Sequence, residues 1–303
     1  MDQKIKIGVS PLSWMNSDIP KLGRHIAPEQ CLIDAASIGY EGIELEDPFR
    51  KIIDTLPSLL KKYGLSLIGG WHSTFLLENS ITKEKENLKR HMDLLDSLGA
   101  RIVNMAECSR AIHRNEIGLS QKPVMDEEEW KYLCESLDEL AFFLQTQEFT
   151  SAYHYHVGTV IQNSDEIEKL MDNTSRLGLL FDSGHLRFTG VDPIPLLKKY
   201  IHRVRHVHAK NIRPSVLENR LSEDASFFSA ILSGVFTVPG DVKESESPPI
   251  DFEAICDILL EHHYNGWIVV EAEQDPKKAP PYPNAKLGYE TITKFLMREK
   301  THF

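Results

Sequence analysis

The feature that most constrains the fold is an alternation of short apolar runs with segments of helical spacing along the whole chain. The apolar runs predict eight strands at residues 4–10, 42–46, 65–69, 101–105, 149–155, 177–182, 203–208 and 267–272. Helical spacing fills segments between them, such as residues 50–63, 83–98, 127–145 and 251–263. Strands that alternate with helices pair in parallel, because each connection has to cross back over the sheet.

Eight strand–helix units without a linker or low-complexity tract predict an α/β fold, a (β/α)₈ TIM barrel formed as a single domain by residues 1–303. The main rival is a doubly wound open sheet. That fold often carries a glycine-rich phosphate loop after its first strand, whereas SPLSWMNSD stands there in this chain. The barrel is therefore the favoured architecture.

Residue types at the expected helix ends support this division of the chain. Asp251 precedes a helical segment and is expected to cap it through its side chain. Glycine is expected after the last turn of a helix, where a left-handed residue is needed, at Gly39, Gly64, Gly99 and Gly178.

The charge balance argues against two classes of partner. There are 34 basic and 45 acidic side chains, and the net charge of −11 repels a nucleic-acid backbone and an anionic membrane. The chain has no run of about 18 uncharged apolar residues, and MDQKIKIGVS has the pattern of a strand instead of a signal peptide. We expect a cytoplasmic protein without nucleic-acid or membrane partners. The four cysteines are widely spaced, form no CxxC motif and are expected to be reduced.

Four apolar runs end in acidic or imidazole side chains: SAYHYH (151–156), LGLLFDSGH (177–185), RHVHAK (205–210) and WIVVEAE (267–273). Six of the 13 histidines fall between residues 154 and 208. The C-terminal strand ends of a barrel form its active-site face, and divalent ions of the Mn, Co and Zn group accept imidazole and carboxylate ligands together. We therefore predict one metal site formed by His154, Asp182, His208 and Glu271.

Residues two apart in a strand point the same way, so three pairs share a face: His154 with His156, His206 with His208, and Glu271 with Glu273. Only one member of each pair is expected to lie at the height of the ion.

Several longer strings together resemble one known family: GVSPLSW, GWHS, LSQKPVMDEEEW, AYHYHVGTV, LLFDSGHLRFTG, HVHAKNIRP, GVFTVPGD and VVEAEQDP. They are similar to the inosose dehydratases of bacterial myo-inositol breakdown. That family lies within the superfamily of sugar-phosphate isomerase and epimerase-like, or xylose isomerase-like, metal-dependent TIM barrels. The resemblance extends from about residue 5 to about residue 296. It implies a lyase that dehydrates a small polyhydroxy cyclic ketone, with Mn²⁺, Co²⁺ or another divalent metal, and a requirement for glutathione.

The resemblance also assigns the metal ligands, at His154, Asp182, His208 and Glu271. The epimerases of the superfamily usually have Glu at the position of His154 and use two opposed glutamates as acid and base. With His154 there, two-glutamate epimerisation loses support and dehydration gains it. A second departure is Asn211, where the dehydratase pattern usually has Asp, which removes one negative charge near the site.

Dehydration of a hydroxyketone needs a base, a cation that stabilises the enolate, and an acid for the departing hydroxyl. The catalytic candidates for these roles are Lys210, His156, His185 and Glu271. The substrate-binding candidates are Trp14, Trp71 and Glu273, with Asp275 and Glu107 as weaker candidates.

Two connections, residues 107–125 and 212–250, are too long for plain strand-to-helix loops and follow strand ends, so they are expected to lie over the active-site face. The second has an ordered part, SFFSAILSGVFTVPGD, and then a polar turn, VKESESPP, that is expected to be mobile. A sugar or inosose isomerase or epimerase, a nuclease and a non-catalytic carbohydrate-binding barrel stay open as alternatives. The oligomeric state also stays open, a homo-oligomer included.

Overall fold

The eight predicted strands form a closed parallel barrel in a computed structural model that describes residues 5–241 and 249–298. The strands are hydrogen-bonded in the order β1-β10-β7-β6-β5-β4-β3-β2, and β2 pairs with β1 to close the barrel. Their bounds are β1 Lys6–Val9, β2 Gly42–Leu45, β3 Ser66–Thr74, β4 Ile102–Glu107, β5 Thr150–His154, β6 Leu179–Asp182, β7 Val204–Ala209 and β10 Trp267–Val270. The prediction of a (β/α)₈ barrel is therefore confirmed, and the open sheet is excluded.

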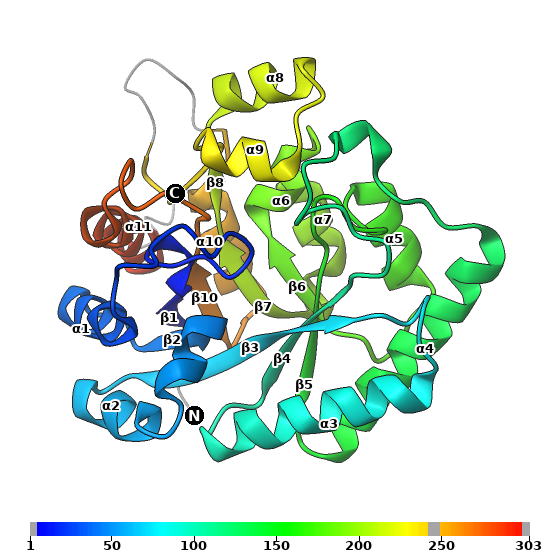
Figure 1. Cartoon of the computed structure of the whole chain (residues 1–303), viewed down its shortest axis with the longest axis horizontal. Helices are drawn as coiled ribbons and strands as arrows, with labels where there is room; N and C mark the ends of the chain where they lie inside the picture. Colours follow the sequence, from blue (N-terminus) through cyan, green and yellow to red (C-terminus); the bar gives the residue numbers. More distant parts are fainter. Residues whose placement is uncertain (1–4, 242–248, 299–303) are drawn as a thin grey trace.

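Helices connect successive strands and surround the barrel (Figure 1). They are α1 Pro28–Ile38, α2 Leu56–Tyr63, α3 Ile81–Ser97, α4 Glu127–Thr146, α5 Ser164–Asp172, α6 Ser183–Phe188, α7 Pro193–Tyr200, α10 Phe252–Glu261 and α11 Pro281–Leu296. Single turns of 3-10 helix stand at η1 Pro11–Ser13, η3 Leu119–Gln121 and η4 Ile201–Arg203, and a longer one at η2 Asp47–Ile52. None of the helices in the described residues is both long and apolar enough to cross a membrane.

The expected helix ends are found with one exception. Asp251 caps α10 by accepting a hydrogen bond from the Ala254 N–H, and Gly39, Gly64 and Gly99 take positive φ angles after α1, α2 and α3. Gly178 does not adopt a left-handed conformation. It is needed for close approach instead, because a Cβ there would lie 2.2 Å from the Ser151 carbonyl oxygen of β5.

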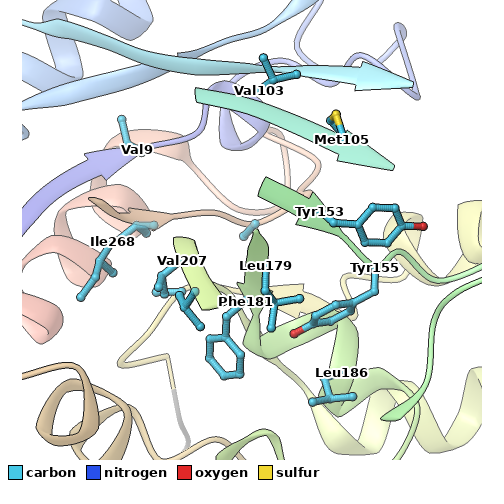
Figure 2. Packing of buried hydrophobic residues seen from close by; sticks show 14 of the residues in the cluster. Val9, Val103, Met105, Tyr153, Tyr155, Leu179, Phe181, Leu186, Val207 and Ile268 are labelled. Carbon is cyan, nitrogen blue, oxygen red and sulfur yellow. The ribbon is translucent and has the colours of Figure 1, made fainter. Parts of the chain in front are cut away.

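Alternation along β5 divides its side chains between the barrel interior and the surrounding core. The rings of Tyr153 and Tyr155 lie among buried apolar side chains such as Leu179 and Leu186 (Figure 2). The Tyr155 hydroxyl donates to the Asp182 carbonyl at 2.7 Å and accepts from the Asp182 N–H at 2.8 Å. Tyr155 of the SAYHYH run therefore holds the main chain at the end of β6 in place.

The excursion after β7 folds into four short elements over the C-terminal ends of the strands (Figure 1): β8 Asn211–Ile212, α8 Pro214–Ser222, α9 Phe227–Leu232 and β9 Phe236–Thr237. It is tied to the other long connection, since Ser120 donates its N–H and its hydroxyl to the carboxylate of Asp224. The turn expected to be mobile falls largely on residues 242–248, outside the described residues. The domain bounds of 1–303 likewise stay a prediction.

Candidate metal centre and active site

The four residues predicted to bind one ion meet at the C-terminal end of the barrel. His154, Asp182 and His208 lie at or near the ends of β5, β6 and β7, and Glu271 follows β10. One ligand atom from each lies within 4.8 Å of all the others. None of the four side chains is more than 5% exposed.

Contacts inside this cluster show which atoms face its centre. His154 Nε2 lies 3.2 Å from Asp182 Oδ2. His208 Nδ1 lies 3.2 Å from Glu271 Oε1 and 3.5 Å from Asp182 Oδ2. The other carboxylate oxygen of Asp182 caps α6 by accepting from the His185 N–H at 2.7 Å, which leaves Oδ2 directed at the cluster.

Glu44, near the end of β2, was not among the predicted site residues. Its Oε1 accepts hydrogen bonds from His206 Nε2 at 2.8 Å, His208 Nε2 at 3.1 Å and Asn104 Nδ2 at 2.7 Å. Burial alone would raise the pKa of Glu44, but His208 and His206 lower it to about 2. The only available signal was an acidic residue inside an apolar strand, GIELE, where a buried charge needs partners.

The hydrogen bond between His208 and Glu44 shows why the four-residue cluster suits a cation. Burial alone would lower the pKa of His208, but the carboxylates of Glu271 and Glu44 hold it above its usual range. Because a carboxylate accepts, Nε2 of His208 carries a proton, so Nδ1 has the lone pair that a second proton or a metal ion can take. This lone pair faces the carboxylates of Asp182 and Glu271 and has no hydrogen-bond partner among the described residues. Lone pairs that converge in a buried space repel one another unless a proton or a metal ion lies between them. Two imidazoles and two carboxylates are a donor set that suits Mn²⁺, Co²⁺ or Zn²⁺.

Two neighbouring groups of titratable residues have a similar composition but do not suit a metal. In the group of Glu44, His206 and His208, both Nε2 atoms donate to Glu44 and have no lone pair to offer. In the group of His156, His185 and Glu273, the Lys210 ammonium already contacts Glu273 Oε1 at 2.8 Å. A fixed cation there opposes the binding of a second one.

The main chain of Val157 assigns the protons of two histidines in that second group. His156 Nδ1 lies 2.8 Å from the Val157 carbonyl oxygen, which can only accept, so His156 Nδ1 carries a proton and Nε2 has the lone pair. The Val157 N–H donates to His185 Nδ1 at 3.2 Å, so the proton of neutral His185 is on Nε2. The ring centroids of His156 and His185 are 4.1 Å apart. Nε2 of His156 can accept a hydrogen bond, whereas Nε2 of His185 can donate one. Burial is the largest cause that lowers both pKa values, which keeps the rings neutral.

Lys210 is fully buried and lies between the metal cluster and Glu273. Its Nζ is 2.7 Å from Glu271 Oε1, 2.8 Å from Glu273 Oε1 and 3.4 Å from Asp182 Oδ2. Burial alone would lower the pKa of Lys210, but the three carboxylates hold it above its usual range. Lys210 is therefore a fixed cation. The pKa of Glu273 is raised to about 7, chiefly by burial and against the effect of Lys210.

A cavity of about 760 Å³, including its open mouth, adjoins these groups. Trp71 lines it, with its ring 5.4 Å from that of His154. Arg114, from the connection after β4, contributes to the rim and donates to Asp18 at 2.7 Å. The predicted site residues on its wall are His154, His156, His185, His208, Glu271, Glu273 and Trp71.

Trp14 does not reach the cavity. Its side chain is 1% exposed, and its indole N–H donates to Asp34 Oδ2 at 2.8 Å, which anchors it beside α1. Glu107 is also absent from the cavity wall, because its carboxylate accepts from the backbone N–H groups of Leu76 and Ser109. Both residues were predicted from their places after strand ends, and both have partners that point them elsewhere.

Asn211 joins the barrel to the excursion. Its amide Nδ2 lies 3.3 Å from the Val238 carbonyl oxygen and 3.4 Å from that of Asp241. An aspartate could not donate to these carbonyl groups. The departure from the dehydratase pattern therefore adds donors that face the segment after β9.

Comparison with known proteins agrees with the barrel fold. The family model described as xylose isomerase-like TIM barrel matches residues 32–296. The rhizopine catabolism protein MocC of Rhizobium meliloti is 39% identical over 96% of this chain and 88% of its own length. An inosose dehydratase of Clostridium botulinum (strain Eklund 17B / Type B) is 36% identical over 96% of this chain and 97% of its own length. Among solved structures, the IOLI protein, which has a bound zinc atom, superposes with a TM-score of 0.68 at 15% identity, covering 98% of this chain and all of its own.

Proposed function

The chain belongs to the xylose isomerase-like TIM barrel family, and we propose that within this family it is a metal-dependent inosose dehydratase. Its substrate is scyllo-inosose, a keto derivative of myo-inositol, and its products are water and a trihydroxycyclohexane dione. Similarity to inosose dehydratases over nearly the full length supports the substrate. The reaction type is supported by three groups beside the metal cluster. They are the lone pair of His156, the fixed ammonium of Lys210 and the N–H donor of His185.

His154 Nε2, Asp182 Oδ2, His208 Nδ1 and Glu271 Oε1 would hold the divalent ion, because these atoms already face one another. The ion supplies Lewis-acid polarisation of the substrate carbonyl. We propose Mn²⁺ or Co²⁺ from the family resemblance, while the zinc atom of the IOLI protein makes Zn²⁺ the third metal to test. The glutathione requirement that the resemblance implies stays a prediction, as do the cytoplasmic location and the oligomeric state.

His156 is the proposed base. Its Nε2 lone pair can take the proton from the carbon next to the ketone, and the electron pair of that C–H bond forms the enolate. His156 Nδ1 keeps its hydrogen bond to the Val157 carbonyl in both protonation states, so no rearrangement accompanies the transfer. His185 cannot act in this way, because a second proton on its ring would break the hydrogen bond from the Val157 N–H. It is a donor through Nε2–H.

The second half of the reaction expels the hydroxyl on the next carbon. The enolate electrons reform the carbonyl group and a carbon–carbon double bond as the C–O bond breaks. The hydroxyl takes a proton from the His156 imidazolium and leaves as water, and the remaining enol converts to the dione. The Lys210 ammonium stabilises the enolate charge from a fixed position, where Glu271 and Glu273 hold it.

Two cavity-wall residues are proposed to bind the ring of the substrate. Trp71 offers an apolar face of the size of a cyclohexane ring, and its indole N–H is engaged by Ser73 at 2.8 Å. Glu273 can accept hydrogen bonds from substrate hydroxyls, since its Oε2 has no partner among the described residues.

Product analysis tests this proposal. Incubation of the protein with scyllo-inosose and Mn²⁺ is expected to give an absorbing dione that is lighter than the ketone by one water, without consumption of a nicotinamide cofactor. Recovery of a stereoisomer of unchanged mass would establish the epimerase alternative instead. Tight binding of the ketone without turnover in the presence of each metal would favour a non-catalytic barrel.

A further inference from the structure

We propose that Glu44 is the positioning residue that makes Nδ1 of His208 the metal-binding nitrogen. The inference rests on the metal site of the proposed function and adds to it a residue from β2. Glu44 reaches across the barrel interior to β7, where it contacts both His206 and His208. Its side chain is only 4% exposed.

The three N–H donors on Glu44 Oε1 determine the orientation of the His208 ring. Rotation of this ring by half a turn would put a carbon atom where Nε2 donates to Glu44 and another where Nδ1 faces the carboxylates. The charge-assisted hydrogen bond of 3.1 Å would be lost. Glu44 thus selects one ring orientation and one tautomer, and both aim the lone pair at Asp182 and Glu271.

His206 offers an internal comparison, because it contacts the same oxygen of Glu44 but is not one of the four residues whose ligand atoms converge. Its Nδ1 is buried without a hydrogen-bond partner among the described residues. A role for Glu44 confined to barrel stability would make His206 and His208 equivalent. A positioning role concerns His208 alone.

The first test measures Mn²⁺ affinity by competition with a chelator, without substrate. Glu44→Gln removes the charge and is expected to weaken binding by about 10- to 100-fold, as is typical for partners of metal-binding histidines. The matched control is His206→Gln, which removes the other imidazole. It is expected to lower thermal stability while Mn²⁺ affinity stays within about threefold of wild type, below the range expected for Glu44→Gln. Wild-type affinity in Glu44→Gln, or equal weakening in both variants, would overturn the inference.

The second test does not require a variant of Glu44. Asn at position 208 places its amide oxygen near the position of Nδ1, whereas Gln reaches the position of Nε2 and faces Glu44. We expect His208→Asn to retain more Mn²⁺ affinity than His208→Gln, and the reverse order would overturn the inference. If the wild-type protein binds no divalent ion, the proposed metal site fails together with this inference. Normal binding in Glu44→Gln leaves the proposed function intact.

Discussion

The Val157 N–H donates a hydrogen bond to His185 Nδ1 at 3.2 Å, and this bond separates the roles of two neighbouring histidines. His185 is held as an Nε2–H donor, whereas His156, which donates to the carbonyl oxygen of the same residue, keeps a free Nε2 lone pair. One residue of main chain therefore determines which imidazole can accept a proton from substrate.

Variants of the two histidines are expected to fail at different steps. In His156→Gln, loss of the base should abolish both product formation and exchange of the hydrogen next to the ketone with deuterated solvent. In His185→Gln, the amide can still donate near the position of Nε2, so exchange should persist while turnover falls. Mass spectrometry of recovered substrate measures the exchange. Normal exchange in His156→Gln would contradict its assignment as the base.

Lys210→Met is expected to lower turnover by about 100- to 1000-fold, the usual effect of losing one preorganised group that stabilises developing charge. Metal content should stay normal, because removal of the ammonium takes a positive charge away from Glu271 and Asp182. Steady-state kinetics and elemental analysis of the same sample provide both readouts. Lys199→Met, on the exposed face of α7, is the control for loss of a lysine. A metal-free Lys210→Met protein would show a structural role instead.

Asp182→Ala is expected to abolish stoichiometric metal binding. The variant removes the carboxylate that faces both His154 and His208, and it also removes the cap of α6, so a loss of stability is expected as well. Elemental analysis after loading and dialysis measures the metal. Asp251→Ala removes the cap of α10, which is not part of the cluster, and controls for the loss of stability. One full equivalent of metal in Asp182→Ala would refute the ligand assignment.

The features predicted from the sequence are those that depend on local residue pattern, namely the strands and the residues at their ends. Short apolar runs located the strands, and the active-site face of a barrel then brought His154, Asp182, His208 and Glu271 together. The sequence did not predict Glu44, because the partners of that carboxylate come from β4 and β7, far along the chain. Nor did it predict the hydrogen bond from Trp14 to Asp34 of α1, which only the tertiary fold brings about. The protons of His156 and His185 depend on main-chain geometry, which no residue type encodes.

The excursion is expected to contribute to catalysis through Phe236. This ring lies 4.9 Å from Lys210 Nζ and 5.3 Å from the His185 ring, and it excludes water from both. Phe236, Thr237 and Val238 are fully buried, so replacing residues 236–241 with a flexible linker would also reduce stability. Phe236→Leu is a sharper change, because it keeps an apolar side chain but removes the cation–π contact.

We expect Phe236→Leu to lower kcat by about tenfold, given a cation–π contribution of roughly 1–2 kcal/mol in a buried site. The melting temperature should fall only slightly. Phe188→Leu is the matched control, because the centroid of this ring lies 5.7 Å from that of Phe236 and the cation–π contact of Lys210 is made to Phe236. Equal losses of turnover in the two variants would show that the excursion acts only through packing.

Two buried histidines outside the metal cluster are expected to make the stability of the protein depend on pH in the acidic range. His72 of β3 and His91 of α3 lie with their rings 5.3 Å apart. Burial is the largest cause that lowers the pKa of His72 to about 3 and that of His91 to about 4. His91 further lowers the pKa of His72, and Arg50 further lowers that of His91. The Gly70 carbonyl oxygen, 3.3 Å from His91 Nε2, only partly offsets this. Both rings are therefore neutral in the folded protein at neutral pH.

Because unfolding releases these histidines to an ordinary pKa of 6.5, the unfolded chain binds more protons below that pH. The stabilisation is complete above about pH 6.5 and is lost as the pH falls toward 4, by roughly 3 kcal/mol for His91. Urea unfolding of wild type and His91→Gln between these pH values measures the effect. The free energy of unfolding is expected to depend on pH less steeply in His91→Gln than in wild type, because unfolding of the variant takes up about one proton fewer. This difference in slope does not depend on the stability of the variant at neutral pH. Parallel pH dependences would show that His91 is protonated in the folded protein, against the effect of its burial.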